Sequence, residues 1–444
     1  MCYTVCMKKH LLSVLLVLFS CGGAWAAGLK LSIACDRPDH LYACGEKAVY
    51  TVTVTEANGA RPAAGVIEAR LDNFGPQVIA SAKWDLAATN RFTLAGVLTE
   101  PGFLRLTVKA PKTAPAVWAV AYEPEKIRKG SPSPADFDAF WAEARKKLAR
   151  DVPPDMQLTR IDERSTATFD FFRISFATFG RRVYGYLTVP TDKARAPFPV
   201  HVEVNAAGFG AWTNDLQGHP DRICVRFSVH PFDMDWRWKE KGMKADYDAL
   251  HADAQKRFGA KNWYTAGITE GRDVYVYYSA LLGIDRAVDW VAARPDVDRT
   301  RFWYSGTSQG GGFGFYLCGL NKAFTRAVFY VPAITDTMGY LAGRDSGWPK
   351  IVENNSSSPE KRAAAEKWAP YYDGANFAAR ITCPVCVVVG FADLTCPPCA
   401  VYAAYNAIPS SEKKILHGFG MGHRCRSDLY TDGRTWLEKG AARK

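Results

Sequence analysis

Apolar and polar positions alternate along the chain from about residue 28 to residue 120. The stretches 48–60, 65–75 and 102–111 show this period of two, and Gly, Asn and Pro residues separate them. Strict alternation between turn residues is typical of strands that bury one face. The pattern predicts a small all-β, immunoglobulin-like sandwich over residues 27–123. It holds no catalytic cluster, so two roles remain open: contact with or positioning of the next domain, and passive packing.

After Pro124 the pattern changes. Residues 131–149 begin with Ser and Pro and continue as an amphipathic helix, and residues 172–190 have the pattern of a hairpin. Short apolar runs then alternate with helical stretches as far as "KKILHGF", which ends at Phe419. Strands that alternate with helices over roughly 300 residues predict an α/β domain with a doubly wound, mostly parallel sheet. We assign residues 124–444 to it.

The N-terminal residues have the features of an export signal. Two lysines precede an apolar stretch too short to span a bilayer, and Ala24-Trp25-Ala26 matches a small-x-small cleavage site. Residues 1–26 are therefore predicted to be a signal peptide, with periplasmic or extracellular release. A lipid anchor at Cys21 is the less favoured alternative, because bulky Phe19 fits a lipoprotein box poorly. The rest of the chain has no apolar segment of the length that a spanning helix needs, so we predict no integral membrane segment after leader removal.

Composition and charge exclude other classes. With 48% hydrophobic residues the chain is globular, and its net charge of +11 is spread along the sequence. It has no block of like charges such as a nucleic-acid arm or a polybasic membrane anchor contains, so no nucleic-acid partner is expected.

The cysteine count points to an unpaired thiol. The chain has 12 cysteines, of which nine follow the predicted leader, and an odd number leaves at least one without an intrachain partner. Cys35 and Cys44 flank a short loop and are predicted to form a disulfide.

Two C-x-x-C pairs, at 383/386 and 396/399, look like a zinc site. However, "CVVVG" is typical of a buried strand, in which Cys383 and Cys386 would point to opposite faces. Core packing is therefore favoured, and no metal or other cofactor is predicted.

The strongest chemical signal is the stretch "RFWYSGTSQGGG". A short β-prone run leads into Gly306-Thr307-Ser308-Gln309-Gly310, and a sequence that can open a helix follows. Strand, G-x-S-x-G and helix in this order form a nucleophile elbow, which exposes the serine hydroxyl. Ser308 is the predicted nucleophile. The alternative is a serine that caps a helix after a glycine turn.

A serine nucleophile needs a base and an acid, which in this fold follow it in the order acid, then histidine. Only His417 and His423 lie after Ser308. His417 ends a predicted strand, whereas His423 lies in a loop just beyond it and is preferred. For the acid, Asp393 and Asp336 each follow a predicted strand, and Asp393 is favoured.

The oxyanion of an acyl-transfer reaction needs two preorganised donors. We expect one to be the backbone N–H of Gln309, directly after the nucleophile. The other should come from the loop "NAAGFG" after the strand "VHVEV", and we predict that it is the backbone N–H of Phe209.

From "SPADFDAFWAEA" to the C-terminus, the residues resemble the acetyl xylan esterase and cephalosporin C deacetylase family of α/β-hydrolases. The family's G-x-S-Q-G is matched at Ser308, its D-x-x-C-P-P segment at Asp393, and its G-H-E motif at His423. The resemblance implies that Asp393 is the acid, and it accounts for Cys383 and Cys396 without zinc.

Three departures from the family's pattern concern the neighbourhood of the site. The H-G-Y loop appears here as Ala207-Gly208-Phe209, and the residue after the histidine is Arg424 in place of glutamate. The R-G-Q motif is missing, and "RICVRFSVHPFDMDW" stands in its place. Little depends on the first change, because a backbone N–H does the work of that loop, whereas Arg424 and the missing R-G-Q motif bear on the pocket walls, the substrate and the possible homo-oligomer.

Aromatic residues are dense between positions 209 and 264 and could form a sugar platform at the mouth of the site. Packing in the core or in loops is the alternative. The candidate substrate-lining residues are Trp212, Trp236 and Trp263.

Together these features predict a secreted serine esterase that removes O-acetyl groups from carbohydrate through an acyl-enzyme. Two alternatives remain. The same triad could act on another acyl or uronoyl ester or on a peptide, or the fold could be an inert glycan-binding protein.

Overall fold

The computed structural model describes residues 29–209, 216–233 and 242–439. The predicted signal peptide, its alternative anchor Cys21, and the candidates Trp212 and Trp236 lie outside these residues. Within them, no helix has both the length and the apolar character needed to cross a membrane.

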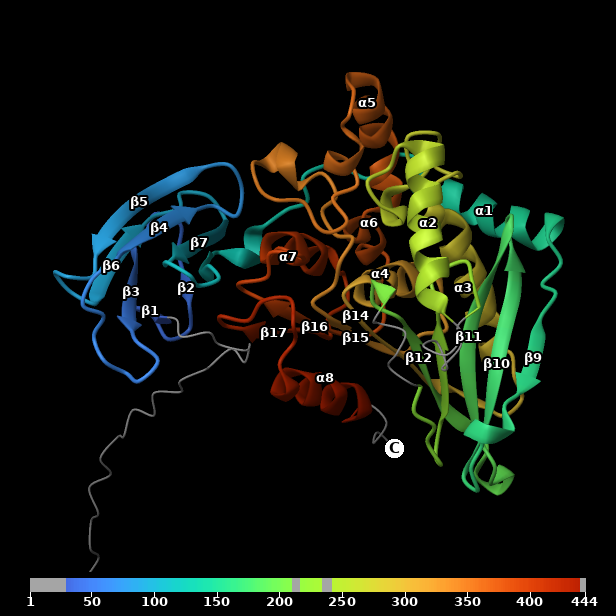
Figure 1. The fold of residues 1–444 in the computed structure, drawn as a ribbon. Coiled ribbons are helices and arrows are strands. Elements are labelled where there is room, and N and C mark those ends of the chain that lie inside the picture. Colours follow the sequence, from blue (N-terminus) through green and yellow to red (C-terminus); the bar gives the residue numbers. More distant parts are fainter. Residues whose placement is uncertain (1–28, 210–215, 234–241, 440–444) are drawn as a thin grey trace, which may run out of the picture.

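The N-terminal part, residues 30–122, is all β and is called the β unit below (Figure 1). It has a three-stranded sheet of order β1-β3-β6 and a five-stranded sheet of order β2-β8-β7-β4-β5. Pairing is antiparallel except between β2 and β8. Alternation along β3 buries every second residue between the sheets, as its sequence predicts. The strands are β1 (Lys30–Cys35), β2 (Leu41–Tyr42), β3 (Ala48–Thr55), β4 (Val66–Asp72), β5 (Val78–Asp85), β6 (Arg91–Gly96), β7 (Gly102–Lys109) and β8 (Ala116–Tyr122).

The remaining residues, called the α/β unit, contain a nine-stranded sheet of order β17-β16-β15-β14-β12-β13-β11-β10-β9. The six strands β12 to β17 run parallel, and β9, β10 and β11 join one edge antiparallel. The predicted fold class, an α/β unit after an antiparallel β region, is confirmed. The strands are β9 (Gln157–Arg160), β10 (Phe169–Thr178), β11 (Arg181–Pro190), β12 (Phe198–Val204), β13 (Ile223–Phe227), β14 (Val297–Thr307), β15 (Arg326–Tyr330), β16 (Val385–Gly390) and β17 (Lys413–Gly418).

Helices cover both faces of this sheet. Helix α8 packs Leu429 and Leu437 against one face, where Val328 and Val388 of the central strands are buried. Residues of α1, α3, α4, α6 and α7 share the main hydrophobic core on the other face. The helices are α1 (Phe137–Asp151), α2 (Met243–Phe258), α3 (Val276–Ala292), α4 (Gln309–Leu320), α5 (Pro359–Trp368), α6 (Gly374–Ala378), α7 (Pro398–Ala407) and α8 (Ser427–Lys439).

The two units share one core. Phe74, Phe103, Ala119 and Ala121 of the β unit belong to the main hydrophobic cluster of the α/β unit. In Figure 1, α7 lies on the side of the sheet that faces the β unit. The boundary at residue 123 stays a prediction, because buried side chains are continuous across it.

The predicted disulfide between Cys35 and Cys44 is wrong, since both thiols are unbridged. The Cys35 thiol donates to the Arg37 carbonyl at 2.9 Å and lies 3.4 Å from His40 Nδ1. Cys44 instead has the Glu123 carboxylate as its hydrogen-bonding neighbour. A short loop between two cysteines does not fix where their side chains point.

Candidate active site

Ser308 lies between the end of β14 and the start of α4 and has φ 56° and ψ −117°. Few residues other than glycine adopt such a positive φ, and here neighbouring backbone hydrogen bonds hold it. The Ser308 N–H donates to the Tyr330 carbonyl at 2.9 Å, and the Ser308 carbonyl accepts from Gly312 and Ala333, each at 2.9 Å. The sharp turn between strand and helix is the elbow that the sequence predicts.

Both glycines of G-x-S-x-G are required by close backbone contacts. A Cβ added to Gly306 would lie 2.4 Å from the Gly310 carbonyl oxygen, and one on Gly310 would lie 2.1 Å from the carbonyl oxygen of Val204 in β12. Neither distance leaves room for a side chain. The first turn of α4 is therefore packed directly against the end of β12.

The structure brings Ser308, His423 and Asp393 into one hydrogen-bonded row. His423 Nε2 lies 2.9 Å from Ser308 Oγ, and His423 Nδ1 lies 2.8 Å from Asp393 Oδ2. The serine is 7% exposed and the aspartate is fully buried, whereas the histidine side chain is 33% exposed. A base in contact with a hydroxyl and held by a buried carboxylate can activate that hydroxyl.

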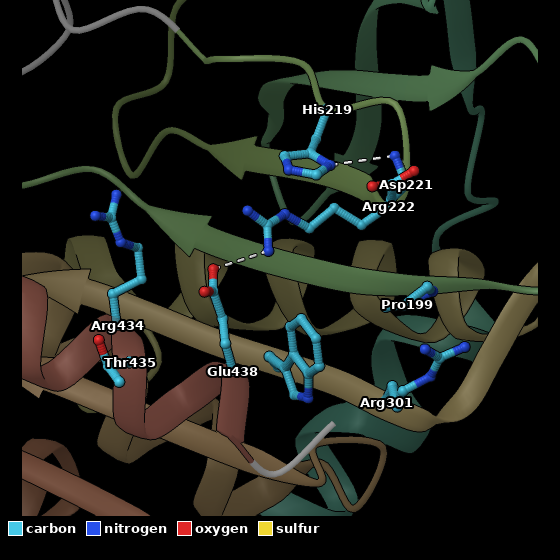
Figure 2. A pocket seen from close by; sticks show the side chains of 9 residues that line it. Pro199, His219, Asp221, Arg222, Arg301, Arg434, Thr435 and Glu438 are labelled. Carbon is cyan, nitrogen blue, oxygen red and sulfur yellow. Dashed lines mark hydrogen bonds and ion pairs between the residues drawn. The ribbon is translucent and has the colours of Figure 1, made fainter. Parts of the chain in front are cut away.

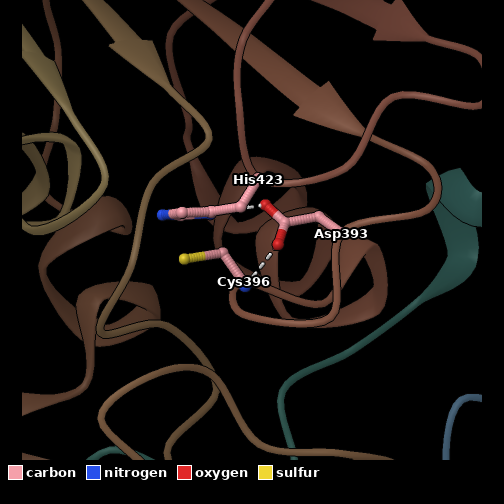
Figure 3. A group of neighbouring side chains, drawn as sticks. All are labelled: Asp393, Cys396 and His423. Carbon is pink, nitrogen blue, oxygen red and sulfur yellow. Dashed lines mark hydrogen bonds and ion pairs between the residues drawn. The ribbon is translucent and has the colours of Figure 1, made fainter. Parts of the chain in front are cut away.

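Asp393 is held by its own loop, as Figure 3 shows. Its Oδ1 accepts the backbone N–H groups of Thr395 at 2.8 Å and Cys396 at 2.9 Å, which leaves Oδ2 for the imidazole. The Cys396 sulfur and the outer nitrogen of His423 point in the same direction. Burial, and then the Asp393 charge, raise the pKa of the Cys396 thiol well above its usual value, which keeps it protonated.

The two rival residues have other surroundings. His417 lies in β17, and its Nε2 is 2.7 Å from the Tyr402 hydroxyl. Asp336 is buried and pairs with Arg344 at 2.8 Å, and it accepts the Gly130 N–H at 2.6 Å. Asp336 therefore ties the chain after the β unit to the loop after β15.

The side chain of Gln309 connects the two segments that carry the predicted oxyanion donors. It is buried, its Oε1 accepts from the Tyr277 hydroxyl at 2.7 Å, and its Nε2 donates to the Asn205 carbonyl at 3.3 Å. Asn205 directly follows β12 and precedes the Ala207-Gly208-Phe209 loop. The Gln309 backbone N–H opens α4, where the first turn has no partner within the helix.

A contact that sequence reasoning missed supports the other segment. The Gly208 N–H donates to the Tyr264 hydroxyl at 2.7 Å. That hydroxyl also lies 3.0 Å from His230 Nε2 and 3.1 Å from the Tyr247 hydroxyl. Tyr264 is 5% exposed, and burial raises the pKa of its hydroxyl, which keeps it protonated.

His230 lies in the segment that replaces the missing R-G-Q motif. It is fully buried, and burial lowers the pKa of its imidazole well below the usual value, so the ring is neutral. The departure from the family's pattern thus supplies a buried imidazole against Tyr264. The only sequence signal was the density of aromatics around Tyr264.

Among the candidate substrate-lining tryptophans, the structure describes Trp263. It is 4% exposed, with ring centroids 5.1 Å from His230 and 5.4 Å from Tyr264. The packing alternative accounts for this residue, because so enclosed a ring offers little open surface. Phe209 is half-buried and its ring centroid lies 5.7 Å from that of Tyr247.

The four cysteines of the two C-x-x-C pairs do not converge. Cys383 contacts Cys318 and packs against the main core, whereas Cys386 lies in the cluster under α8 on the other face of the sheet. Cys396 instead belongs to a group with Asp393 and His423 whose ligand atoms all lie within 4.8 Å of one another. The first pair is separated as expected, but not by alternation within one strand, because Cys383 precedes β16 and only Cys386 lies in it.

A separate cavity of about 570 Å³ lies beside β12, β14 and α8 (Figure 2). Arg222 and Glu438 form an ion pair of 3.0 Å across it, and the Asp221 N–H donates to His219 Nδ1 at 3.1 Å. The residues that line it are Pro199, His219, Asp221, Arg222, Arg301, Trp303, Arg434, Thr435 and Glu438. Ser308, Asp393 and His423 are not among them.

A mostly parallel sheet with a serine at the turn after a central strand is the architecture of the α/β-hydrolases. The family model "Acetyl xylan esterase (AXE1)" matches residues 122–426 of this chain. The chain belongs to the acetyl xylan esterase family and is a carboxylic ester hydrolase.

Individual relatives agree with this assignment. The acetyl esterase Axe7A of Xylanibacter ruminicola is 28% identical over 452 aligned positions, which cover 98% of this chain and 97% of that protein. Two solved structures share the fold. The acetyl xylan esterase of Paenibacillus sp. R4 has a TM-score of 0.58 and 22% identity, with 71% of this chain and 98% of that chain covered. Acetyl xylan esterase 1 of Thermoanaerobacterium sp. JW/SL YS485 has a TM-score of 0.57 and 19% identity, with 72% and 98% covered.

Proposed function

We propose that the protein is an exported serine esterase that removes O-acetyl groups from carbohydrate, with Ser308, His423 and Asp393 as its catalytic triad. The observation that carries the proposal is the hydrogen-bonded row of these three side chains at the elbow after β14. Membership in the acetyl xylan esterase family supports acetyl as the acyl group.

In the first half of the reaction Ser308 Oγ attacks the acetyl carbonyl carbon, and its proton passes to His423 Nε2. The contact of 2.9 Å is within the range for this transfer. Asp393 holds the ring and stabilises the imidazolium that forms. Collapse of the tetrahedral adduct breaks the bond to the sugar oxygen, which takes the proton from Nε2 and leaves as an alcohol.

The negative charge on the adduct's oxygen is stabilised by the backbone N–H groups of Gln309 and Phe209. The Gly208 N–H already donates to Tyr264, so the next amide in that loop is the one we assign. The side-chain bond from Gln309 to the Asn205 carbonyl keeps the two donor segments at a fixed separation.

In the second half, water attacks the acetyl-serine and gives a proton to His423. The adduct then breaks the Ser308 Oγ–acyl bond, the serine recovers its proton, and acetate leaves. The Cys396 thiol is also close to His423 but stays protonated, which leaves Ser308 as the nucleophile.

The test is acetate release from acetylated xylan and from p-nitrophenyl acetate by the protein and its Ser308→Ala variant. We expect both substrates to be cleaved and the variant to lose roughly a thousandfold or more of kcat/KM. Cleavage of the small ester alone would retain the triad and replace acetylxylan by another ester. Equal inactivity of the protein and its variant would favour the glycan-binding alternative.

A further inference from the structure

The β unit contacts the α/β unit through a group of rings that we call the aromatic seam: His40, Phe103, Trp118, Phe391 and Phe419. The His40 ring stacks on Phe419 with centroids 4.2 Å apart and an interplanar angle of 11°. Phe103 meets Phe391 edge-on at 5.0 Å. Within the α/β unit, Phe391 and Phe419 are 5.1 Å apart, also edge-on. Both geometries are favourable for aromatic pairs.

Trp118 presses directly on the backbone beside Phe419. Gly420 has φ +63°, and a Cβ added there would lie 2.2 Å from a ring carbon of Trp118. Only a glycine leaves room for this contact. The indole therefore sets the path of the chain between Phe419 and the loop that follows.

The aromatic seam lies next to the catalytic loops. Phe391 precedes Asp393 by two residues, and Phe419 precedes His423 by four. The two loops are also joined by backbone hydrogen bonds, from the Phe391 N–H to the Gly418 carbonyl at 3.0 Å and from the Ala392 N–H to the Met421 carbonyl at 3.0 Å. A shift in the seam is thus transmitted to both members of the Asp393–His423 pair.

The two solved relatives align with only part of this chain, and the part that remains includes the β unit. In each alignment, 98% of the relative's length matches 71% or 72% of this chain. The family model begins at residue 122. The β unit is therefore additional to the family's hydrolase part, and it packs where Asp393 and His423 are held.

We propose that His40, Phe103 and Trp118 are positioning residues, through which the β unit fixes the Asp393–His423 pair against Ser308. This inference rests on the proposed catalytic roles of those three residues. An error of about 1 Å in such a geometry can cost a hundredfold in rate. The β unit accordingly contributes to catalysis by positioning these residues, and its role is more than packing.

The test uses the full chain with His40→Ala, and His40→Phe as the matched variant that keeps a stacking ring. Val52→Ala is the stability control, since Val52 is fully buried in the β unit's own core and is absent from the seam. Stoichiometric labelling with an alkyl fluorophosphonate counts intact serine sites. kcat and KM for p-nitrophenyl acetate are then compared per labelled site.

We expect His40→Ala to lower kcat per labelled site about tenfold with KM nearly unchanged, and His40→Phe to restore most of it. Val52→Ala should lower thermal stability while kcat per labelled site stays at the level of the parent protein. Phe103→Leu provides a second seam variant that retains an apolar side chain, and it should also lower kcat.

Unchanged kcat per labelled site in both His40→Ala and Phe103→Leu would overturn the inference, as would an equal fall in Val52→Ala. These outcomes are separate from failure of the proposed function, which would appear as equal inactivity, or equal activity, of the parent protein and Ser308→Ala.

Discussion

The two halves of the candidate site are built in different ways. On the serine side, the position of Ser308 is fixed by backbone against backbone, since Gly306 and Gly310 leave no room for a Cβ. On the Asp393–His423 side, backbone hydrogen bonds also join the loops, but ring side chains pack against them in addition, and several of those rings belong to the β unit. The backbone contacts on the serine side join residues up to about 100 positions apart, as for Gly310 and Val204, whereas the ring contacts on the other side join residues about 290 to 380 positions apart.

This difference determines how each half tolerates change. A Cβ added to Gly310 would lie 2.1 Å from the Val204 carbonyl oxygen, and closely packed backbone offers it no room, so the serine side should fail abruptly. Packed rings can shift, so the histidine side should lose rate by degrees. The predictions below test that contrast.

The largest effect is expected from Asp393→Asn, which keeps the shape of the side chain. The Asn amide cannot stabilise the imidazolium and favours the wrong tautomer of His423, so kcat should fall by about 10³- to 10⁴-fold. Steady-state kinetics with p-nitrophenyl acetate, corrected by fluorophosphonate labelling, would measure it. A loss of less than about tenfold would contradict the role of Asp393.

Asp336→Asn is the matched control, because Asp336 is the rival acid from the sequence. It breaks the buried pair with Arg344 and should cost on the order of 3 kcal/mol of stability. Chemical denaturation should show that loss, while kcat per labelled serine remains that of the parent. A larger fall in kcat for Asp336→Asn than for Asp393→Asn would reverse the assignment.

The next largest effect should come from Gly310→Ala, which places a Cβ 2.1 Å from the Val204 carbonyl oxygen. The elbow must move away from β12, and we expect about a hundredfold loss of kcat/KM together with a lower melting temperature. Gly422→Ala is the counterpart beside His423. Its Cβ would meet only the Ala392 carbonyl oxygen at 3.8 Å, an ordinary contact. Similar losses in both variants would remove the contrast between the halves.

The sequence was sufficient where structure is set locally. Alternation predicted β3, β4 and β7, and the G-x-S-x-G run predicted the turn between β14 and α4. It failed for the Cys35–Cys44 pair, because spacing along the chain says nothing about side-chain direction. The aromatic seam could not be predicted from the sequence either, because nothing near Phe103 or Phe391 in the chain indicates that the two rings are in contact.

Tyr264 is a subtler example of the same limit, and it yields the smallest predicted effect. Tyr264→Phe removes only the hydroxyl that accepts the Gly208 N–H, and the ring can keep its packing. The loop that carries the proposed Phe209 donor should then align less well with the developing oxyanion. Loss of a whole oxyanion donor costs about a hundredfold or more, so loosening one should lower kcat several-fold with little change in KM.

Tyr247→Phe is the control for that substitution, because it removes a hydroxyl that contacts Tyr264 at 3.1 Å and keeps the Tyr247 ring that packs against Phe209. Its kcat should fall less than that of Tyr264→Phe. Burst and steady-state rates with p-nitrophenyl acetate separate acylation from deacylation, and both should slow in Tyr264→Phe because each passes through an oxyanion. Slowing of one step alone would mean that Tyr264 acts on the leaving group or on water, and the oxyanion loop would need another support.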